Sequence, residues 1–352
     1  MTVTPFVPAP TVIAATNGAS RTAEWATVVA DRGTSIRQQR HGTRRQMHRA
    51  AGLTIVATLT LAAPAASQPD EQRLVADAQR LLAPSNAERI AALEALLDQR
   101  GLSYVAHEFP GPRDRNDSRQ VGRNLVLTFG TGLPAIVVGA HADAAQLQDG
   151  SLSHGMVDNA AGVVALLELA ESLRDDPPDR QVRVVFFDME ELGLVGSEAF
   201  VSTLQPSAVA GMINVDIVGY GDTVLFGPDG SDRAEPPGAG GMTLADRVRH
   251  VCAGQSLVCV STPRMPPSDD RSFTGAGIPS VSIAMLPAAQ THQIWLLLNG
   301  GEQSGLREGW VPEILQTIHT DRDTTDRLEP QTLGRAARLL TQLVRDFAAD
   351  GG

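Results

Sequence analysis

Short runs of apolar residues recur along the chain without polar interruption, and turn-forming residues bound each run. Runs of this length that are rich in β-branched residues are typical of strands buried on both faces. The central strands predicted in this way are AIVVGA (135–140), VRVVFF (182–187), GMINVDIV (211–218) and PSVSIAML (279–286). Further strands are expected at LSYVAHEF (102–109), NLVLTF (124–129) and VLFG (224–227).

Between the strands, apolar residues recur every three or four positions, which is the spacing of an amphipathic helix. The predicted helices lie at 70–100, with a break at Pro84, and at 160–173, 197–204, 242–253 and 333–349. Because buried strands alternate with amphipathic helices, the sequence predicts an α/β fold, a three-layer sandwich with a mostly parallel, mixed central sheet flanked by helices. No internal repeat or linker divides residues 68–352, so we expect a single domain there.

Residues 1–67 have a different pattern. An uncharged apolar segment at 50–63 follows three arginines and precedes the small residues PAAS. Its 14 residues are fewer than the about 20 that span a membrane. This pattern predicts a signal peptide cleaved after Ala65 or Ser67, with a retained membrane anchor as the alternative. We therefore expect an exported protein, secreted or periplasmic, without a stable membrane anchor.

The residues before the apolar segment leave two export routes open. Met47 begins a leader of ordinary length, which favours translation from that methionine. The string TRRQMHR (43–49) is a loose match to a twin-arginine signal, and this interpretation requires the upstream residues to be translated.

Charge and cysteine content narrow the function further. The formal net charge of -11 argues against a nucleic-acid-binding protein, which needs a basic face for phosphates. The two cysteines are too few for a disulfide scaffold and do not have zinc-ribbon spacing. In an exported protein a bridge between Cys252 and Cys259 and a pair of buried thiols are equally compatible with the sequence.

Candidate metal ligands follow the predicted strands. In an open α/β sheet, ligands bind beyond the carboxyl ends of the strands. His141 directly follows the strand at 135–140, and Asp143 is placed to orient its imidazole, as carboxylates commonly do for ligating histidines. Asp158 begins the helix near 160, where it is suited either to cap the helix or to bridge two cations.

Three more acidic residues and a second histidine complete the candidate set. Glu190 and Glu191 come shortly after the strand at 182–187, and Asp216 ends the strand at 211–218, where a buried carboxylate needs a partner. His319 lies in a loop before the last helix. Nitrogen and oxygen ligands together suit zinc, and five ligands with one bridging carboxylate suit a two-metal hydrolase with metals about 3.5–4 Å apart.

Five strings occur in a characteristic order: GAHAD (139–143), MVDNAAGV (156–163), FFDMEELGLVGS (186–197), NVDIVGY (214–220) and IHTDRDT (318–324). Together they resemble the co-catalytic, two-zinc aminopeptidases of the bacterial leucyl aminopeptidase type. Glutamate carboxypeptidases and glutaminyl cyclases are relatives of that family. The resemblance runs from about Val121 to Phe347.

The resemblance implies a role for each residue of the set. His141 and Asp216 are the expected ligands of one zinc ion, and Glu191 and His319 those of the other. Asp158 is the expected bridge between the two ions. Glu190 is the expected general base.

Two segments depart from the family pattern or lie outside it. In SDDRSFTGAGIP (268–279), Asp270 stands where the family often has histidine, which puts a substrate role for that position in doubt. The segment AQTHQIWLLLNGGEQSGLREGW (289–310) matches no general family motif, and a pocket wall, a lid and a purely structural loop all remain open.

The function implied by the resemblance is a secreted metalloexopeptidase with two zinc ions that acts on peptides with a free N-terminus. Two alternatives share the fold: a glutaminyl cyclase, which typically works with one zinc ion, and a carboxypeptidase. A third alternative is a non-catalytic binding protein on a decayed peptidase fold. The sequence does not predict the oligomeric state.

Overall fold

The computed structural model describes residues 70–112, 121–228, 242–301 and 309–349. The expected leader at 1–67 lies outside the described residues. All described residues belong to one unit of dense contacts that spans Pro64–Gly352. In this part of the chain, no helix has the length and apolarity needed to cross a membrane.

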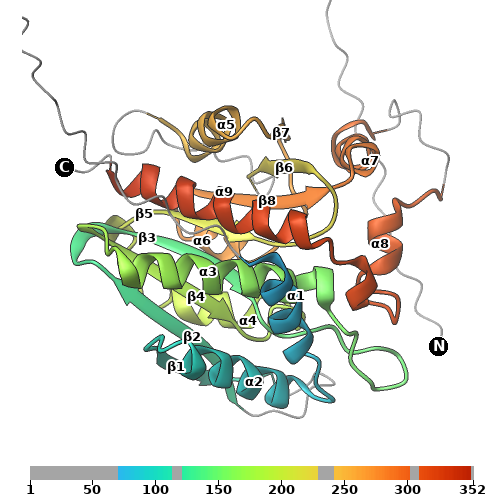
Figure 1. Ribbon diagram of the computed structural model, residues 1–352, viewed down its shortest axis with the longest axis horizontal. Coiled ribbons are helices and arrows are strands. Elements are labelled where there is room, and N and C mark those ends of the chain that lie inside the picture. The colour runs from blue at the N-terminus through green and yellow to red at the C-terminus, as the bar shows by residue number, and fades with distance from the viewer. Residues whose placement is uncertain (1–69, 113–120, 229–241, 302–308, 350–352) are drawn as a thin grey trace, which may run out of the picture. The chain divides into compact units, whose positions relative to one another are not determined.

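An eight-stranded sheet forms the centre of the structure (Figure 1). The strand order is β1-β2-β4-β3-β5-β8-β6-β7. The strands are β1 (Val105–Pro110), β2 (Val121–Phe129), β3 (Gly132–His141), β4 (Arg180–Phe187), β5 (Val209–Val215), β6 (Thr223–Gly227), β7 (Val258–Ser261) and β8 (Ser280–Leu286).

The four central strands β4, β3, β5 and β8 run parallel to one another. Antiparallel pairs flank them, because β2 runs against β4 on one side and β6 runs against β8 on the other. The predicted mixed, mostly parallel sheet is therefore confirmed. Since β3, β4 and β5 are parallel neighbours, their carboxyl ends meet at one edge of the sheet, where a site is expected.

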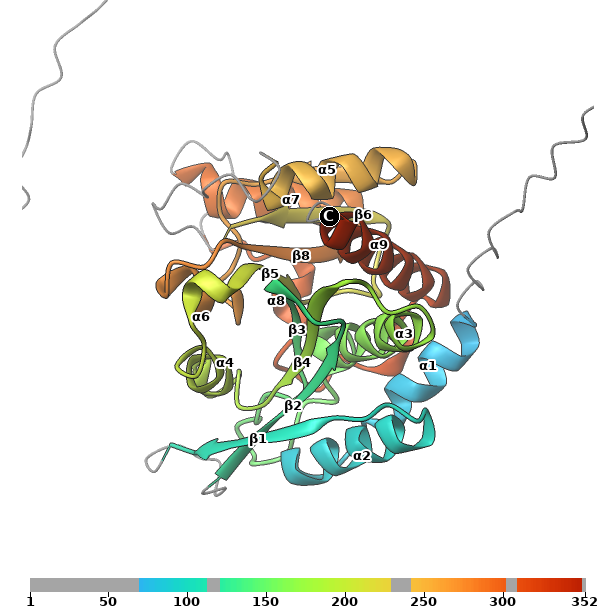
Figure 2. The same cartoon turned by 90° about the vertical axis from the view of Figure 1, so that its left-hand side faces the viewer.

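Helices cover both faces of the sheet, as predicted (Figure 2). One face carries α1, α2, α3 and α9, and the other carries α4 and α6. The helices are α1 (Glu71–Arg80), α2 (Asn86–Gln99), α3 (Ala161–Asp175), α4 (Val195–Val201), α5 (Leu244–Gly254), α6 (Asp270–Gly275), α7 (Ala288–Asn299), α8 (Glu313–Thr317) and α9 (Pro330–Ala349).

The apolar runs of the sequence account for the core. In β3 the residues from Ala135 to His141 are all buried, and α3 buries nearly every apolar side chain because it lies between the sheet and α9. The prediction for 211–218 was too long, since β5 ends at Val215 and Asp216 lies just beyond it. Elements that the periodicity did not predict are β7, α6, α7 and α8.

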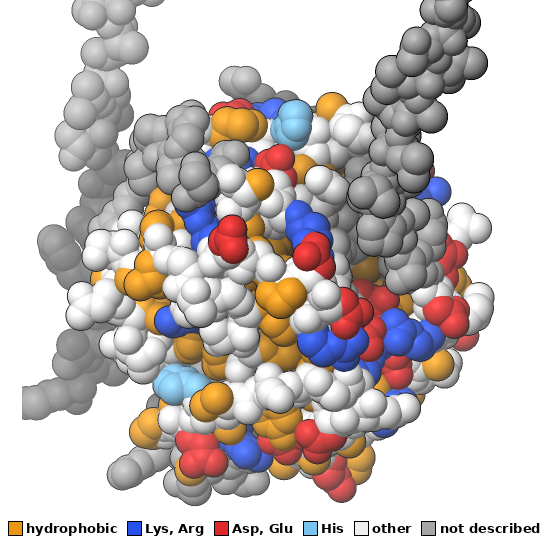
Figure 3. Space-filling model, turned by 60° about the vertical axis from the view of Figure 1, so that its left-hand side comes forward, with side chains coloured by type: hydrophobic (Ala, Val, Ile, Leu, Met, Phe, Trp, Pro, Cys, Tyr) orange, Lys and Arg blue, Asp and Glu red, His pale blue; other side chains and the backbone are white. Residues whose placement is uncertain are grey.

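Cys252 and Cys259 form a disulfide with their Cα atoms 6.3 Å apart. The bond joins the end of α5 to β7, at the outer edge of the sheet. On the surface shown in Figure 3, arginine side chains lie beside acidic ones and do not form a separate basic patch.

Candidate metal centre

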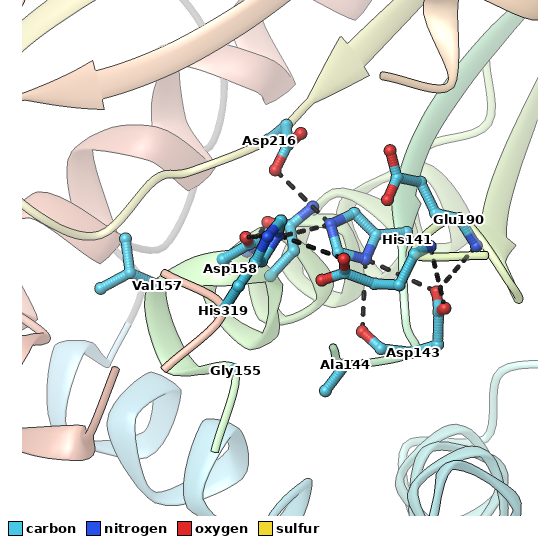
Figure 4. A network of polar contacts seen from close by, with 12 residues as sticks. His141, Asp143, Ala144, Gly155, Val157, Asp158, Glu190, Asp216 and His319 are labelled. Carbon is cyan, nitrogen blue, oxygen red and sulfur yellow. Dashed lines mark hydrogen bonds and ion pairs between the residues drawn. The ribbon is translucent and has the colours of Figure 1, made fainter. Parts of the chain in front are cut away.

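The candidate ligands meet at the carboxyl ends of the parallel strands (Figure 4). His141 is the last residue of β3, and Asp216 directly follows β5. Glu190 and Glu191 lie in the turn after β4, on the neighbouring strand. The parallel order of the strands thus gathers side chains that are far apart in the sequence.

The carboxylate of Asp158 lies between the two histidines. Its Oδ1 is 2.9 Å from Nε2 of His141, and its Oδ2 is 3.1 Å from Nε2 of His319. Glu191 Oε2 is also 3.1 Å from Nε2 of His319, and Asp216 Oδ1 is 3.5 Å from Nε2 of His141. Potential ligand atoms of His141, Asp158 and Glu191 all lie within 4.8 Å of one another. Each Asp158 oxygen therefore belongs to a different half of the cluster.

Asp158 does not cap α3, although its position near a helix start allowed that interpretation. The N-cap of α3 is Ala160, without a side-chain hydrogen bond, and Asp158 itself has non-helical dihedral angles. The chain bends here, and the peptide bond from Asp158 to Asn159 is cis. The distances of its two oxygens to His141 and His319 show that the side chain is aimed at the histidines and not at the helix amides.

Asp143 holds the candidate ligands in place through hydrogen bonds on the side away from the cluster. Its two carboxylate oxygens accept hydrogen bonds from the backbone N–H groups of Glu190 and Glu191, at 3.1 and 3.2 Å. Nδ1 of His141 lies 3.2 Å from the carbonyl oxygen of Asp143. An Nδ1 proton donated to this carbonyl leaves the lone pair of Nε2 free for a metal ion.

A second buried aspartate, Asp323, holds the chain next to the central carboxylate. Its Oδ1 accepts from the N–H of Val157 at 2.8 Å, and its Oδ2 accepts from the N–H of Asp158 at 3.1 Å. Burial raises the pKa of Asp323 to about 6, against the effect of these two bonds. The sequence analysis missed this residue. Its position four residues after His319 in IHTDRDT was the available signal.

The donor atoms of the cluster fit metal cations. Glu191 Oε1 and Asp216 Oδ1 are buried and have no hydrogen-bond partner among the described residues. Buried oxygens of carboxylates are rarely left in this state without a compensating charge. Two imidazoles with several carboxylates form the kind of donor set that zinc prefers.

The pKa values of the carboxyl groups reflect their crowding. Burial and the charge of Asp158 raise the pKa of Glu191 to about 7, against the effects of His319 and His141. Burial acts to raise the pKa of Asp158 too, but hydrogen bonds with His141 and His319 outweigh it and hold that pKa below its ordinary value. Burial also raises the pKa of Glu190 well above its ordinary value, against the effect of His141.

The segment 268–279 brings further carboxyl groups to this region. Asp269 and Asp270 are fully buried at the start of α6. Burial raises the pKa of Asp269 to about 7, against the effects of His141 and Ser197. Asp269 thus belongs to the electrostatic surroundings of the ligands, which the sequence analysis did not anticipate.

A small apolar hollow opens beside Asp216. Its apolar walls come from β6, β8, α7, α8 and the loops after β5 and β7. The lining residues besides Asp216 are Ile217, Leu225, Met265, Pro266, Ser282, Ala284, Leu286, Ile294, Ile314 and Leu315. Since Ile294 lies on α7, the segment 289–310 supplies part of a pocket wall.

Comparisons with known proteins find a family model and relatives that resemble this chain. The model of peptidase family M28 matches residues 124–344. The "Probable lipoprotein aminopeptidase LpqL" of Mycobacterium tuberculosis is 30% identical over 240 residues, which cover 65% of this chain and 46% of that protein. The chain thus spans less than half the length of this relative.

Two solved structures share the fold at low sequence identity. The glutaminyl cyclase of Porphyromonas gingivalis aligns with a TM-score of 0.58 and 18% identity, over 79% of this chain and 96% of that one. A Zn-dependent exopeptidase from Parabacteroides distasonis aligns with a TM-score of 0.56 and 17% identity, over 79% of this chain and 94% of that one.

Proposed function

This chain belongs to peptidase family M28, and from that premise we propose that it is an exported two-zinc aminopeptidase. The observation that carries the proposal is the carboxylate of Asp158, which offers one oxygen to the side of His141 and the other to the side of His319. One shared carboxylate with a histidine at each end suits a pair of cations better than a single one.

Each half of the cluster offers a complete set of protein ligands. His141, Asp158 and Asp216 would hold one zinc ion, and Asp158, Glu191 and His319 would hold the other. When bound, such a pair of ions lowers the pKa of a coordinated water from about 15.7 toward 7 and polarises the scissile carbonyl group.

Glu190 is the general base in this proposal. Its backbone N–H is held by Asp143 at 3.1 Å, so the residue is fixed beside the ligands without being needed as one. Its carboxylate takes the proton of the attacking water and passes it to the nitrogen of the leaving group. Burial raises the pKa of Glu190, which makes it a stronger proton acceptor near neutral pH.

The surroundings of Asp216 support action on the first residue of a peptide. The apolar hollow beside Asp216 suits an apolar side chain, because burying that surface is favourable. The surplus of carboxylates at the ligand cluster suits the positive charge of a free N-terminus. We therefore expect a preference for leucine, methionine or phenylalanine at the N-terminal position.

Hydrolysis of aminoacyl p-nitroanilides by the purified protein tests the proposal. The panel contains Leu, Met, Phe, Ala, Glu and Arg derivatives, with N-acetyl-Leu-p-nitroanilide as the control and zinc content measured in parallel. We expect two zinc ions per chain, cleavage of the apolar free-amine substrates, no cleavage of the acetylated one, and loss of activity with a chelator.

Other results would assign a different activity. A single zinc ion with ammonia release from peptides that begin with glutamine would establish a glutaminyl cyclase. Cleavage from the carboxyl end would establish a carboxypeptidase. Cleavage that a chelator does not affect would overturn the metal centre itself.

Export is the second part of the proposal. The leader pattern at 1–67 and the disulfide between Cys252 and Cys259 both suit an oxidising compartment outside the cytoplasm. Mass spectrometry of the protein recovered from the periplasm or medium should give an N-terminus at Ala66 or Gln68. A full-length protein retained in the cytoplasm would contradict export.

A further inference from the structure

We propose that Arg89 is a positioning residue that holds together the two ends of the loop between β3 and α3, next to the candidate ligands His141 and Asp158. The inference rests on the proposed metal centre. Arg89 lies on α2, which supplies none of the candidate ligands, and the residue is only 1% exposed. It therefore acts through the backbone of this loop and not on the substrate.

The guanidinium group donates to four backbone carbonyl groups. Nε donates to Ala142 at 2.7 Å, and Nη2 donates to Gly155 at 2.8 Å. Nη1 donates to His154 at 2.9 Å and to Leu81 at 3.1 Å. Among the described residues, no carboxylate forms an ion pair with Arg89, so its hydrogen-bonding capacity is committed to the backbone.

Three of these carbonyl groups lie at the two ends of one loop, residues 142–155, which joins β3 to the bend before α3. Ala142 directly follows His141, and Gly155 lies three residues before Asp158. The fourth carbonyl group lies just after α1. One rigid, planar group therefore connects the end of the loop next to His141 to the end next to Asp158. A small shift of either end would change the distance between His141 and Asp158, which is 2.9 Å here.

Both ends of the loop between β3 and α3 are packed closely against α2 and the guanidinium group of Arg89. Gly155 has a φ of 56°, and a Cβ atom there would lie 3.2 Å from Nη2 of Arg89 and 2.8 Å from the carbonyl oxygen of Asp158. One turn before Arg89, Asn86 donates to the carbonyl of Ala144 at 3.0 Å and accepts from its N–H at 2.8 Å. The first turn of α2 thus supports the loop after β3 at two adjacent points.

The charge of Arg89 and its hydrogen bonds have opposite effects on metal binding. Burial lowers the pKa of Arg89 to about 10, against the effects of Asp143, Asp323 and Asp158, so the group is charged at neutral pH. A buried positive charge near the ligands repels a metal cation, and its removal alone would strengthen zinc binding. Removal of the hydrogen bonds frees the two ends of the loop and weakens zinc binding. The sign of the change in zinc affinity therefore separates the two effects.

Zinc affinity of the purified full-length protein and its variants, measured by competition with a chromogenic chelator, tests the inference. We expect Arg89→Met to weaken zinc binding about 10- to 100-fold, the range for residues that orient ligands. Arg89→Lys keeps the charge but lacks the planar group with its fixed donors, so we expect it to lose affinity as well. At saturating zinc, kcat should recover toward the wild-type value.

Arg247→Met is the matched control, because Arg247 is also fully buried but packs on Phe347 with its guanidinium 4.7 Å from the ring centroid. It should lower the melting temperature and leave zinc affinity unchanged. If Arg89→Met does not fold, Arg89→Lys decides. Unchanged or tighter zinc binding by a folded Arg89 variant would overturn the inference, whereas a wild-type protein that binds no zinc would overturn the metal centre.

Discussion

Acidic residues with little solvent exposure occur in two regions of this protein, and their partners differ. Where α1 and the end of α2 meet α3, the carboxylates of Asp77, Glu168 and Glu171 pair with Arg73, Arg80 and Arg100. We call these six residues the arginine–acid cluster. Its most buried cation, Arg100, is 6% exposed and contacts all three carboxylates. The acids of this cluster are therefore neutralised by the protein itself.

The candidate metal centre lacks such a balance. Its possible cations are Arg89, which donates to backbone carbonyl groups, and two histidines that lie at about ligand distance from the acids. The carboxyl groups there outnumber these cations and are Asp143, Asp158, Glu190, Glu191, Asp216, Asp269 and Asp323. The comparison teaches that buried acidic residues alone do not indicate a metal site. A surplus of buried carboxylates over the protein's own cations does.

The largest expected effect comes from removing the shared carboxylate. We expect Asp158→Asn to abolish binding of two zinc ions and to lower kcat/KM on the order of 10⁴-fold or more, because the metal ions supply several kcal/mol of transition-state stabilisation. Zinc content and hydrolysis of Leu-p-nitroanilide measure this. The variant Glu168→Gln, in the arginine–acid cluster, should keep both the zinc content and the rate of Leu-p-nitroanilide hydrolysis of the wild-type protein. Full zinc content in Asp158→Asn would show that this carboxylate does not hold metal, and would contradict the distinction drawn between the two acidic regions.

Glu190→Gln separates catalysis from metal binding within the same centre. We expect kcat to fall about 10²- to 10⁴-fold, the usual contribution of a general base, while two zinc ions remain bound. Steady-state kinetics together with metal analysis check this. A variant with wild-type kcat would show that another group accepts the proton, and a variant without zinc would make Glu190 a ligand.

Arg100→Met tests the balanced region. Loss of Arg100 leaves Asp77, Glu168 and Glu171 short of a cation, and breaking buried ion pairs in this way typically costs about 3–5 kcal/mol of unfolding free energy. Denaturant unfolding of the zinc-loaded protein measures the loss. Zinc affinity and kcat should not change. If they fall instead, the two acidic regions are not independent.

The smallest expected effect is a difference in the pH dependence of stability. In the metal-free protein, burial raises the pKa of Glu191 and of Asp269 to about 7, so both groups destabilise the fold as pH rises from about 4 to 7. Hydrogen bonds with Asp158 and Glu191 raise the pKa of His319 to about 11, so its stabilising effect is complete below about 6.5 and is lost as pH rises toward 11.

The two carboxyl groups and His319 all lower the stability of the metal-free protein as pH rises. The melting temperature of the chelator-treated protein should therefore fall by roughly 5 °C between pH 5.5 and 8.5, and the increase on adding zinc should be larger at the higher pH. Differential scanning fluorimetry across that range measures it. A metal-free protein that becomes more stable with rising pH would show that these groups are not held as described.

The sequence predicted the central sheet and the placement of the ligands for one physical reason. Buried parallel strands are short, apolar and bounded, so AIVVGA and VRVVFF were recognisable, and their carboxyl ends marked His141, Glu190 and Glu191 as neighbours. The peripheral elements carried weaker patterns. The helix α7 buries Gln290 and Thr291 beside Ile294 and so has no apolar stripe to reveal it. The strand β7 has four residues, none of them fully buried.

The supporting residues could not be predicted because they act on backbone atoms far away in the sequence. Arg89 looks like an ordinary charged residue of a helix surface, although it precedes Leu93 and Leu96 at the spacing of the apolar face. Asp323 resembles any loop aspartate until the amides of Val157 and Asp158 are placed beside it. The apolar hollow likewise draws residues from Asp216 to Leu315, which only the fold brings together.

In the proposed two-zinc centre, the shared carboxylate of Asp158 would make the occupancies of the two cation positions thermodynamically linked. If binding of the first ion changes the affinity for the second by some factor, binding of the second changes the affinity for the first by the same factor. This holds because both factors express one coupling free energy. A protein stripped of half its metal would therefore not be an equal mixture of independently filled positions. Its population would be weighted toward empty and doubly loaded molecules if the coupling is favourable, and toward singly loaded molecules if it is not.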